Sequence, residues 1–417
     1  MSSVRFIHAA DVHLDAPFKG VDATDPRVRD ALVAATYRAL DAVVDACLAH
    51  EVDFLVLAGD VYNQAERSLR AEFAFRDACQ RLAEAGIRVF VARGNHDPAS
   101  GWSAGLTLPD TVHVFSEREV ERVVFEREGE PACVLYGRSF RTAAERDNLS
   151  LGFSRDLADP LAIGVLHANV GGQPGHEPYA PCSVDDLRAA RMDYWALGHI
   201  HLGGVIEESP AIVYPGCTQG LDPNESGLRG CRLVTLDARG ATVDFVPTSA
   251  VVWAKETVAA DSAATLDDLA RMLGAAADSA FADAAGRPAI VRISLEGRTS
   301  VHAALSRPGV LGDLLEDARA DALGREPWVW IDRIVDHTRP VLDLAAVAEG
   351  EDFAGDLVRI GEALLADDRA LLAYIEDVAR PVLGALDARD VPEVDAAAVL
   401  ERARDLALDR LLAGEGR

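Results

Sequence analysis

Residues 55–63, LVLAGDVYN, decide the fold that we predict for this chain. The run 54–58 is apolar at every position, which is typical of a short parallel strand whose sheet is covered by helices on both faces. Gly59 then ends the strand, and Asp60 follows it. Open α/β sheets place their ligands just beyond the carboxyl ends of such strands. Asp60 is therefore a candidate site residue.

The length and the beginning of the chain set its general class. A chain of 417 residues is too long for one ordinary core, which favours two domains and an appended segment. It enters a strand pattern at residues 4–9 without a basic region and apolar run, and no apolar stretch is long enough to span a bilayer. The six cysteines include no CxxC pair, so we expect buried, reduced thiols. These features predict a cytoplasmic protein that does not act at a membrane.

The charge balance limits how the chain could bind nucleic acid. The formal net charge is −27, whereas coating a polyanion requires clustered Lys and Arg. The only lysines are Lys19 and Lys255, so nearly all of the positive charge is Arg. A nucleic-acid role must therefore depend on a local site, on metal ions or on a partner.

Strands and helices alternate through the first half of the chain. This alternation favours a layered α/β domain with largely parallel strands. Ser183 and Asp186 resemble a capping box at the start of the third helix. Short strands with turns between residues 211 and 246 are expected to complete a second sheet. The predicted strands cover residues 4–9, 54–58, 88–92, 132–136, 161–166 and 194–197, and the predicted helices cover residues 27–50, 66–85 and 183–191.

The pattern changes near residue 250, where we predict a domain boundary. An Ala-rich helix over 259–284 and strands over 289–295 and 328–335 indicate a small α+β domain at 251–340. Residues 341–417 form amphipathic helices with 18 acidic and 8 basic residues, a composition that suits protein contacts better than phosphate contacts. These helices either pack locally or dock on a partner. The predicted division is therefore 1–250, 251–340 and 341–417.

Polar side chains gather after successive predicted strands. The carboxyl ends of parallel strands meet at one edge of a sheet, so these side chains are expected to lie close together. Residues two apart in an extended segment also face the same way, which suits both DVH and HIH. The candidates are Asp11, His13, Asp60, Asn95, His96, Asp97, His167, His199 and His201.

These residue types fit a pair of metal ions that share one carboxylate. Imidazole, carboxylate and amide oxygen without thiolate suit manganese, iron or zinc. Two such ions about 3.5–4 Å apart can hold a phosphodiester and lower the pKa of a bridging water. A lone DxH or HxH is commonly a coincidence, but the joint occurrence after successive strands favours a site. His8 is either next to the site or part of the core, and His50, His113, His176, His302 and His337 are expected to be structural or exposed.

Five motifs resemble those of a known superfamily. DVHLD, GDVYN, RGNHD, LHANV and GHIH, in this order, are similar to the signatures of the calcineurin-like metallophosphoesterases. RFIHAADVHLD resembles the opening of the DNA repair exonuclease branch, the SbcD type. GHEPYAPCSVDDL (175–187), YPGCTQGLDPNESG (214–227) and RPAIVRISLEGRTSVH (287–302) resemble a YhaO-like bacterial subgroup. The resemblance implies an α/β/β/α sandwich of two sheets, with a small α+β capping domain and a C-terminal helical segment.

The resemblance also implies roles for individual residues. Asp11, His13, Asp60 and His201 would bind the first ion, and Asp60, Asn95, His167 and His199 the second, with Asp60 bridging. His96 would be the general acid that protonates the leaving oxygen, with Asp97 orienting its ring. Two positions depart from the pattern. Asn63 stands where the eukaryotic and archaeal nucleases often have His, and LDPNE (221–225) lacks the expected basic or His-containing form.

Three functions follow as hypotheses. The first is a DNA exonuclease or endonuclease in repair, with two divalent ions, manganese in first place and iron or zinc next. In it the terminal helices dock on a coiled-coil ATPase of the structural-maintenance type, and the chain forms a homodimer or acts as one copy. The second is a phosphodiesterase or phosphatase for a small molecule or phosphoprotein, which the acidic balance favours modestly. The third is a non-catalytic scaffold, which the complete ligand set argues against.

Overall fold

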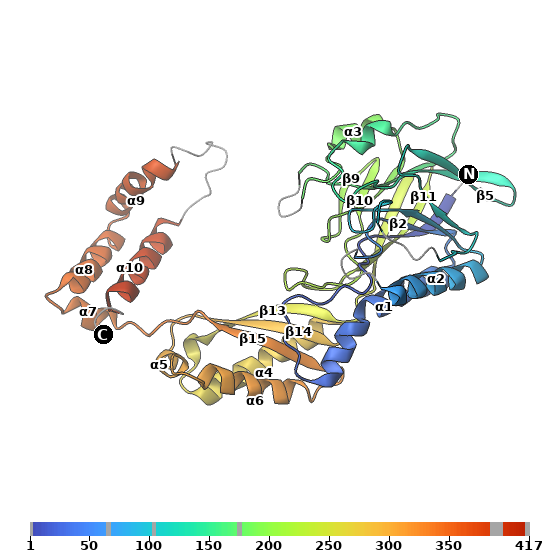
Figure 1. Cartoon of the computed structure of the whole chain (residues 1–417). Coiled ribbons are helices and arrows are strands. Elements are labelled where there is room, and N and C mark those ends of the chain that lie inside the picture. The colour runs from blue at the N-terminus through green and yellow to red at the C-terminus, as the bar shows by residue number, and fades with distance from the viewer. Residues whose placement is uncertain (1–2, 64–67, 102–105, 173–176, 384–394, 413–417) are drawn as a thin grey trace. The chain divides into compact units, whose positions relative to one another are not determined.

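The contacts within the chain divide it into two units. The computed structural model describes residues 3–63, 68–101, 106–172, 177–383 and 395–412 (Figure 1). The first unit comprises residues 1–257, 270–294 and 313–335, and the second comprises residues 258–269, 295–312 and 336–417. The division into 1–250, 251–340 and 341–417 stays a prediction.

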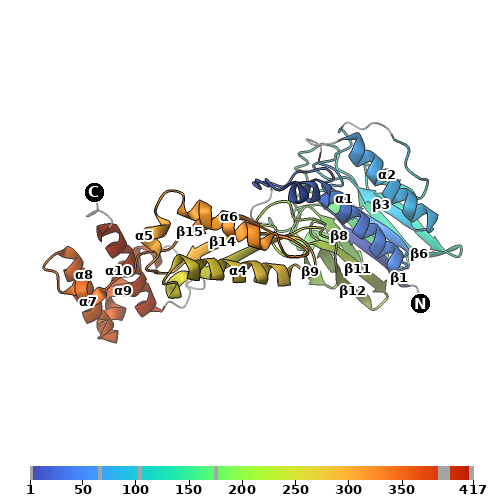
Figure 2. The same cartoon turned by 90° about the horizontal axis from the view of Figure 1, so that it is seen from below.

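The first sheet contains the strand that was predicted over residues 54–58. Its order is β12-β11-β1-β2-β3-β4, in which β1, β2, β3 and β4 are parallel and β11 and β12 are antiparallel additions. The helices α1 (Pro26–Ala49) and α2 (Leu69–Glu84) connect the parallel strands and lie side by side on one face (Figure 2). The strands are β1 (Ser3–Ala9), β2 (Phe54–Ala58), β3 (Arg88–Ala92), β4 (Val112–Val114), β11 (Gly230–Asp237) and β12 (Gly240–Pro247).

The second sheet has the order β5-β6-β7-β8-β10-β9, with its central strands parallel. The short helix α3 (Val184–Ala189) begins with the predicted capping box, because Ser183 and Asp186 bond each other's backbone N–H. Its strands are β5 (Glu121–Arg127), β6 (Glu130–Arg138), β7 (Ala162–His167), β8 (Tyr194–Gly198), β9 (Gly204–Glu208) and β10 (Ala211–Tyr214).

Alternating side chains place three apolar layers around the two sheets. In β1, Ile7 faces the layer under α1 and α2, whereas Phe6 faces the layer between the sheets. In β8, Tyr194 faces the same inter-sheet layer and Trp195 faces the third layer, beneath α3. Because the central strands carry apolar side chains on both sides, both faces of each sheet can be buried. The predicted α/β/β/α sandwich is confirmed.

One part of the sheet prediction is wrong. Residues 211–246 do not all complete the second sheet, since only β10 joins it there, while β11 and β12 extend the first sheet. The pairing of β11 with β1 runs from Ser3 opposite Asp237 to His8 opposite Arg232. In β11, Leu233 fills the helix-covered layer and Val234 the inter-sheet layer, so this strand fits a sheet that is buried on both faces.

A third sheet has the order β13-β14-β15, with α4 and α6 on one face (Figures 1 and 2). Its buried Trp253, Ile290 and Trp330 pack with Val28 and Ala35 of α1. The sequence analysis predicted β14, β15 and α4 but not β13 or α6. The elements are β13 (Val252–Ala259), α4 (Leu266–Asp283), β14 (Ala289–Glu296), α5 (His302–Leu305), α6 (Val310–Ala322) and β15 (Val329–Asp336).

The last part of the chain is helical, as predicted. Ala354, Val358 and Leu408 form a small core of their own with neighbouring apolar residues. Within the described ranges we find no helix with the length and apolar character needed to cross a membrane. The helices are α7 (Leu344–Ala348), α8 (Phe353–Leu365), α9 (Asp368–Leu383) and α10 (Ala396–Leu412).

Candidate metal centre

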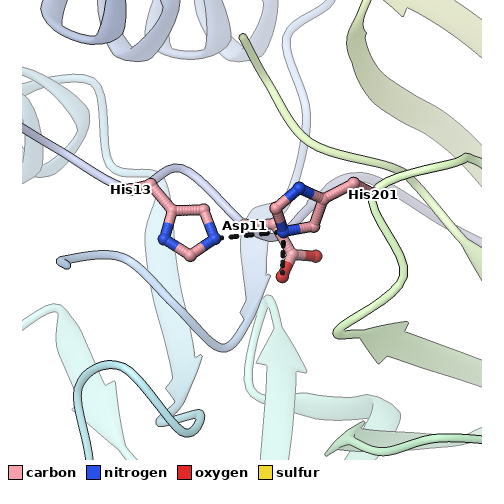
Figure 3. Close-up of side chains that lie close together, drawn as sticks. All are labelled: Asp11, His13 and His201. Carbon is pink, nitrogen blue, oxygen red and sulfur yellow. Dashed lines mark hydrogen bonds and ion pairs between the residues drawn. The ribbon is translucent and has the colours of Figure 1, made fainter. Parts of the chain in front are cut away.

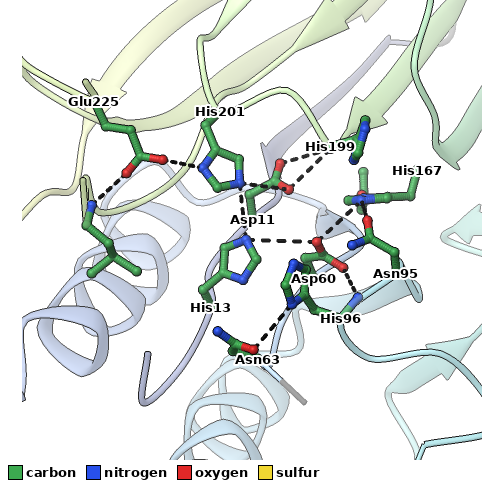
Figure 4. A network of polar contacts seen from close by, with 12 residues as sticks. Asp11, His13, Asp60, Asn63, Asn95, His96, His167, His199, His201 and Glu225 are labelled. Atoms are coloured by element: carbon green, nitrogen blue, oxygen red, sulfur yellow. Dashed lines mark hydrogen bonds and ion pairs between the residues drawn. The ribbon is translucent and has the colours of Figure 1, made fainter. Parts of the chain in front are cut away.

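The predicted ligands converge beyond the carboxyl ends of five strands (Figure 4). Asp11 and His13 follow β1, Asp60 follows β2, and Asn95 follows β3, all in the first sheet. The second sheet contributes His167 at the end of β7, and His199 and His201 after β8. Two sheets that are packed face to face thus deliver polar side chains to one place. We call this group of residues the metal centre.

The backbone around the metal centre is held in an uncommon conformation. Asp11, His13, Asp60 and His199 all have positive φ angles, of 51°, 46°, 53° and 101°. Such angles are uncommon in residues other than glycine, and a cluster of them is a frequent feature of functional sites.

Two glycines make room for the ligands. A Cβ atom on Gly59 would lie 2.2 Å from Nδ1 of His167, and one on Gly94 would lie 2.3 Å from Oδ1 of Asp60. Both distances are far below van der Waals contact, so any side chain here would displace a ligand. Glycine at these positions of GD and GNH is therefore a requirement of the site.

One half of the metal centre is formed by Asp11, His13 and His201 (Figure 3). Nε2 of His13 lies 3.2 Å from Nε2 of His201, which in turn lies 3.8 Å from Oδ1 of Asp11. One ligand atom from each residue lies within 4.8 Å of the others. Two imidazole nitrogens and a carboxylate oxygen that face one point suit a divalent cation.

The other half is formed around His167. Its Nε2 lies 3.0 Å from Oδ1 of Asn95 and 3.4 Å from Oδ2 of Asp60. Oδ2 of Asp60 is also 3.8 Å from Nε2 of His13, so this one carboxylate lies between the two halves. The predicted bridging of two ions by Asp60 stays a prediction, and the position of its carboxylate is compatible with it.

His199 lies beside His167, but its Nε2 faces a backbone carbonyl and not the other ligands. Its ring centroid is 5.2 Å from that of His167, and its Nε2 is 2.8 Å from the carbonyl oxygen of Glu177. The backbone N–H of His199 donates to the Asp11 carboxylate. Coordination of an ion by His199 would therefore use Nδ1.

Burial and mutual charge shift the pKa values in opposite directions. Burial raises the pKa of Asp11 to about 6 and lowers that of His13 to about 3. Burial opposes the charged forms of Asp60 and His167 as well. The attraction between the two side chains outweighs the effect of burial, so the pKa of Asp60 is lowered and that of His167 is raised to about 9. Buried groups with such opposed shifts are typical of a functional site, and a bound cation would satisfy them.

The structure corrects the predicted partner of His96. Asp97 does not orient the His96 ring, because its carboxylate accepts the backbone N–H groups of Val61 and Gly94 at 2.9 and 2.7 Å. Asp97 therefore ties the turn at Gly94 to the segment that follows Asp60. Instead Oδ1 of Asn63 lies 3.2 Å from Nδ1 of His96. The position at which the sequence departs from the nuclease pattern therefore contacts the predicted general acid.

His8 and the other described histidines that were not predicted as site residues lie outside the ligand set. His8 is fully buried between the Tyr194 hydroxyl and the Leu197 carbonyl, each 3.0 Å away, and burial lowers its pKa to about 3. It is a core residue. His113 contacts Glu121 and His302 contacts Thr338, so both have structural partners. His176 lies outside the described residues.

Glu225 is a site residue that the sequence analysis missed. Its Oε1 lies 2.5 Å from Nδ1 of His201, on the opposite side of the ring from Asp11. Burial opposes its ionisation, but the His201 contact and the backbone N–H groups of Leu221 and Asp222 lower its pKa to about 2. The LDPNE segment, which lacks the expected basic residue, supplies this carboxylate instead.

The metal centre opens into a cleft of about 1000 Å³. Asp60, Asn95, His96 and His201 reach its surface, so a ligand much larger than water has access to them. Among the described residues, the other charged side chains of its lining are Lys19, Glu177, Asp222, Glu225 and Arg229.

Comparison with known proteins agrees with this geometry. The model of the calcineurin-like phosphoesterases matches residues 4–203, and that of the metallophosphoesterase YhaO middle domain matches residues 253–339. The chain is 34% identical to metallophosphoesterase YhaO of Bacillus subtilis over 341 residues, which cover 81% of this chain and 83% of that one. The chain belongs to the YhaO-like family of calcineurin-like metallophosphoesterases.

Two further relatives of this YhaO-like chain are more distant. It is 24% identical to the DNA double-strand break repair protein Mre11 of Sulfurisphaera tokodaii, over 50% of this chain and 51% of that one. It is 25% identical to the SbcD component of the nuclease SbcCD of Escherichia coli, over 54% of this chain and 62% of that one. Family membership and the Asp and His cluster together establish a phosphoester hydrolase with a site for divalent metal ions.

Proposed function

We propose that the chain is a metal-dependent phosphodiesterase that cleaves DNA during repair. The observation that carries this proposal is the position of Asp60, whose carboxylate lies between two groups of metal-ligating side chains at the base of an open cleft. That arrangement suits two ions acting on one phosphodiester. DNA is favoured as the substrate because the distant relatives carry the names of a DNA break repair protein and a nuclease.

The chain's own residues divide the chemistry between them. Asp11, His13 and His201 would hold one ion, Asn95, His167 and His199 the other, and Asp60 both. Bound ions, for which we propose manganese, would activate a water and offset the charge of the phosphodiester. His96 faces the same cleft, and Asn63 Oδ1 accepts a hydrogen bond from its Nδ1, so that its Nε2 is left to protonate the leaving oxygen.

A second candidate is a phosphodiesterase for a small molecule. The described cleft lining contains the carboxylates of Asp60, Glu177, Asp222 and Glu225 against the cations Lys19 and Arg229, and the whole chain carries a net charge of −27. Such a field repels a polyanion, and salt at about 0.15 M screens it only beyond roughly 8 Å. A small diester would encounter less of this repulsion than duplex DNA.

A partner protein with a basic surface would allow the chain to act on DNA despite this repulsion. We propose that residues 341–417 dock on a coiled-coil ATPase that supplies the basic DNA surface. The described part of these helices exposes Phe353, Ile360 and Val378, at 70%, 59% and 58%, apolar side chains that a docked partner would cover. The Escherichia coli relative is named as one component of a nuclease with more than one kind of chain, which is consistent with a heteromeric enzyme. The six buried free cysteines accord with a cytoplasmic location.

A paired assay tests the proposed substrate. Purified protein with Mn²⁺ should hydrolyse bis-p-nitrophenyl phosphate and cleave labelled DNA, with the DNA reaction increasing when the ATPase is present. Deletion of 341–417 should spare the small diester and abolish the stimulated cleavage of DNA. Hydrolysis of the small diester alone, with or without an ATPase, would favour the second candidate. Nanomolar binding of duplex by the isolated chain in physiological salt would contradict the need for a partner. Light scattering of the same sample measures whether the chain forms a homodimer.

A further inference from the structure

The two nitrogens of the His201 ring face different groups (Figure 4). Nε2 faces His13 and Asp11, at 3.2 and 3.8 Å, and so points into the metal centre. Nδ1 faces Oε1 of Glu225 at 2.5 Å. A carboxylate acceptor on Nδ1 fixes the proton there and leaves the lone pair of Nε2 for a cation.

Glu225 is itself held in place by its own loop. Its second oxygen, Oε2, accepts the backbone N–H groups of Leu221 and Asp222 at 2.6 and 3.2 Å. Buried Arg229 donates to the carbonyls of His201, Glu225 and Ser226 at 3.1, 3.1 and 2.9 Å, and so ties the loop to the segment that carries His201. The carboxylate therefore has little freedom to leave the imidazole.

In the other half of the metal centre, the histidine rings contact backbone carbonyls, which are weaker hydrogen-bond acceptors than a carboxylate. Nδ1 of His167 faces the carbonyl of Ala58 at 2.9 Å, and Nε2 of His199 faces that of Glu177 at 2.8 Å. A carbonyl fixes the orientation of a ring, whereas a carboxylate also adds a negative charge that the imidazole transmits to a bound cation.

We propose that Glu225 is a positioning residue for the metal centre, which orients His201 and strengthens its hold on the first ion. The role depends on the proposed binding of metal but not on DNA as the substrate. Outer carboxylates of this kind commonly contribute about 10–100-fold to metal affinity.

The test measures metal binding without any substrate. Mn²⁺ is titrated by calorimetry into the full-length wild type, Glu225→Gln and Glu225→Ala. The matched control is Asp222→Asn, which removes the same charge from the same cleft, while its carboxylate contacts the backbone N–H of Asn224.

We expect one binding step to weaken about 10–100-fold in Glu225→Gln and at least as much in Glu225→Ala. The control should stay within about twofold of the wild type. A high Mn²⁺ concentration should restore the kcat of Glu225→Gln on bis-p-nitrophenyl phosphate, because a positioning residue does not itself take part in the reaction.

Several outcomes would overturn the proposal. Unchanged affinity and stoichiometry in both Glu225 variants would remove its role while leaving the metal centre intact. Equal weakening by Asp222→Asn would show a general effect of cleft charge. A wild type that binds no divalent ion would refute the metal centre itself. Because Gln has the shape of Glu, Glu225→Gln decides the question even when Glu225→Ala does not fold.

Discussion

The two halves of the metal centre are built from different ligand chemistry. The first half includes the Asp11 carboxylate, which also lies within 4.8 Å of His167, and only the first half has a further carboxylate, Glu225, behind one of its histidines among the described residues. The second half has the neutral amide of Asn95, and its histidines face backbone carbonyls. The Asp60 carboxylate lies between the two halves. Glu225 adds negative charge to the first half, so we expect an ion in that half to bind more tightly than one in the second. Substitutions in each half should separate the halves or show that they act as one.

Replacement of Asp60 should have the largest effect, since it affects both halves at once. Asp60→Ala should lower the hydrolysis of bis-p-nitrophenyl phosphate by at least about 10⁴-fold, the scale seen when a residue of a catalytic unit is removed. Elemental analysis should show a loss of bound metal, because neither ion keeps the bridge. Metal content equal to that of the wild type would show that Asp60 is not shared.

His96→Ala should leave both halves intact and still slow the reaction. We expect a loss of roughly 10²–10⁴-fold in kcat, the usual contribution of general acid catalysis, with unchanged Mn²⁺ stoichiometry. The loss should be greater for a diester with a poor leaving group than for one that releases p-nitrophenolate. His113→Ala is the control, since that ring contacts Glu121. Wild-type turnover on the poor leaving group would remove the assigned role.

Most of the ligand set could be predicted from sequence because its geometry follows from strand ends. The run 54–58 is β2 as predicted, and 88–92 is β3, since apolar residues on both faces leave few alternatives to a buried strand. Once those strands lie in one sheet, Asp60 and Asn95 must come out at the same edge. No detail of the loops is needed for that conclusion.

The contacts that the sequence did not predict depend on loop conformation. Glu225 reaches His201 only because residues 221–229 fold back on the GHIH segment, and no periodic pattern encodes such a fold. Asn63, and not Asp97, contacts the His96 ring, because the side-chain directions in a tight turn depend on local dihedral angles. The placement of β11 in the first sheet is a long-range pairing, which turn spacing leaves open.

Titration with Mn²⁺ should resolve the halves as two binding steps. The half with more carboxylate should bind at least about tenfold more tightly, since one unit charge at about 4 Å is worth up to about 4 kcal/mol at an effective dielectric constant of 20. His167→Ala should remove the weaker step and His13→Ala should reduce the tighter one. Calorimetry of the three proteins measures this. Loss of the tighter step in His167→Ala would reverse the assignment.

The pH dependence of binding should be the smallest effect, and it should be alike in both halves. In the metal-free protein Asp60 and Asp11 raise the pKa of His167 to about 9 against the opposing effect of burial, and Glu225 raises the pKa of His201. His167 must therefore lose a proton before it can bind an ion, and the raised pKa of His201 acts in the same direction in the other half, while His13, whose pKa burial lowers to about 3, is already neutral.

The sign of the pH effect follows from these raised values. A histidine whose pKa is raised on folding stabilises the metal-free protein fully below its unfolded pKa of about 6.5, and this stability is lost as the pH rises through about 9. Displacement of the same proton makes Mn²⁺ binding stronger as the pH rises, by up to about tenfold per unit for each proton released. The Tm of the metal-free protein should thus fall between pH 6.5 and 8.5, while the increase in Tm on adding Mn²⁺ should become larger. Melting curves with Mn²⁺ and with a chelator at both pH values measure the two trends together. An increase in Tm that is equal at the two pH values would mean that both halves hold their histidines neutral before the metal arrives.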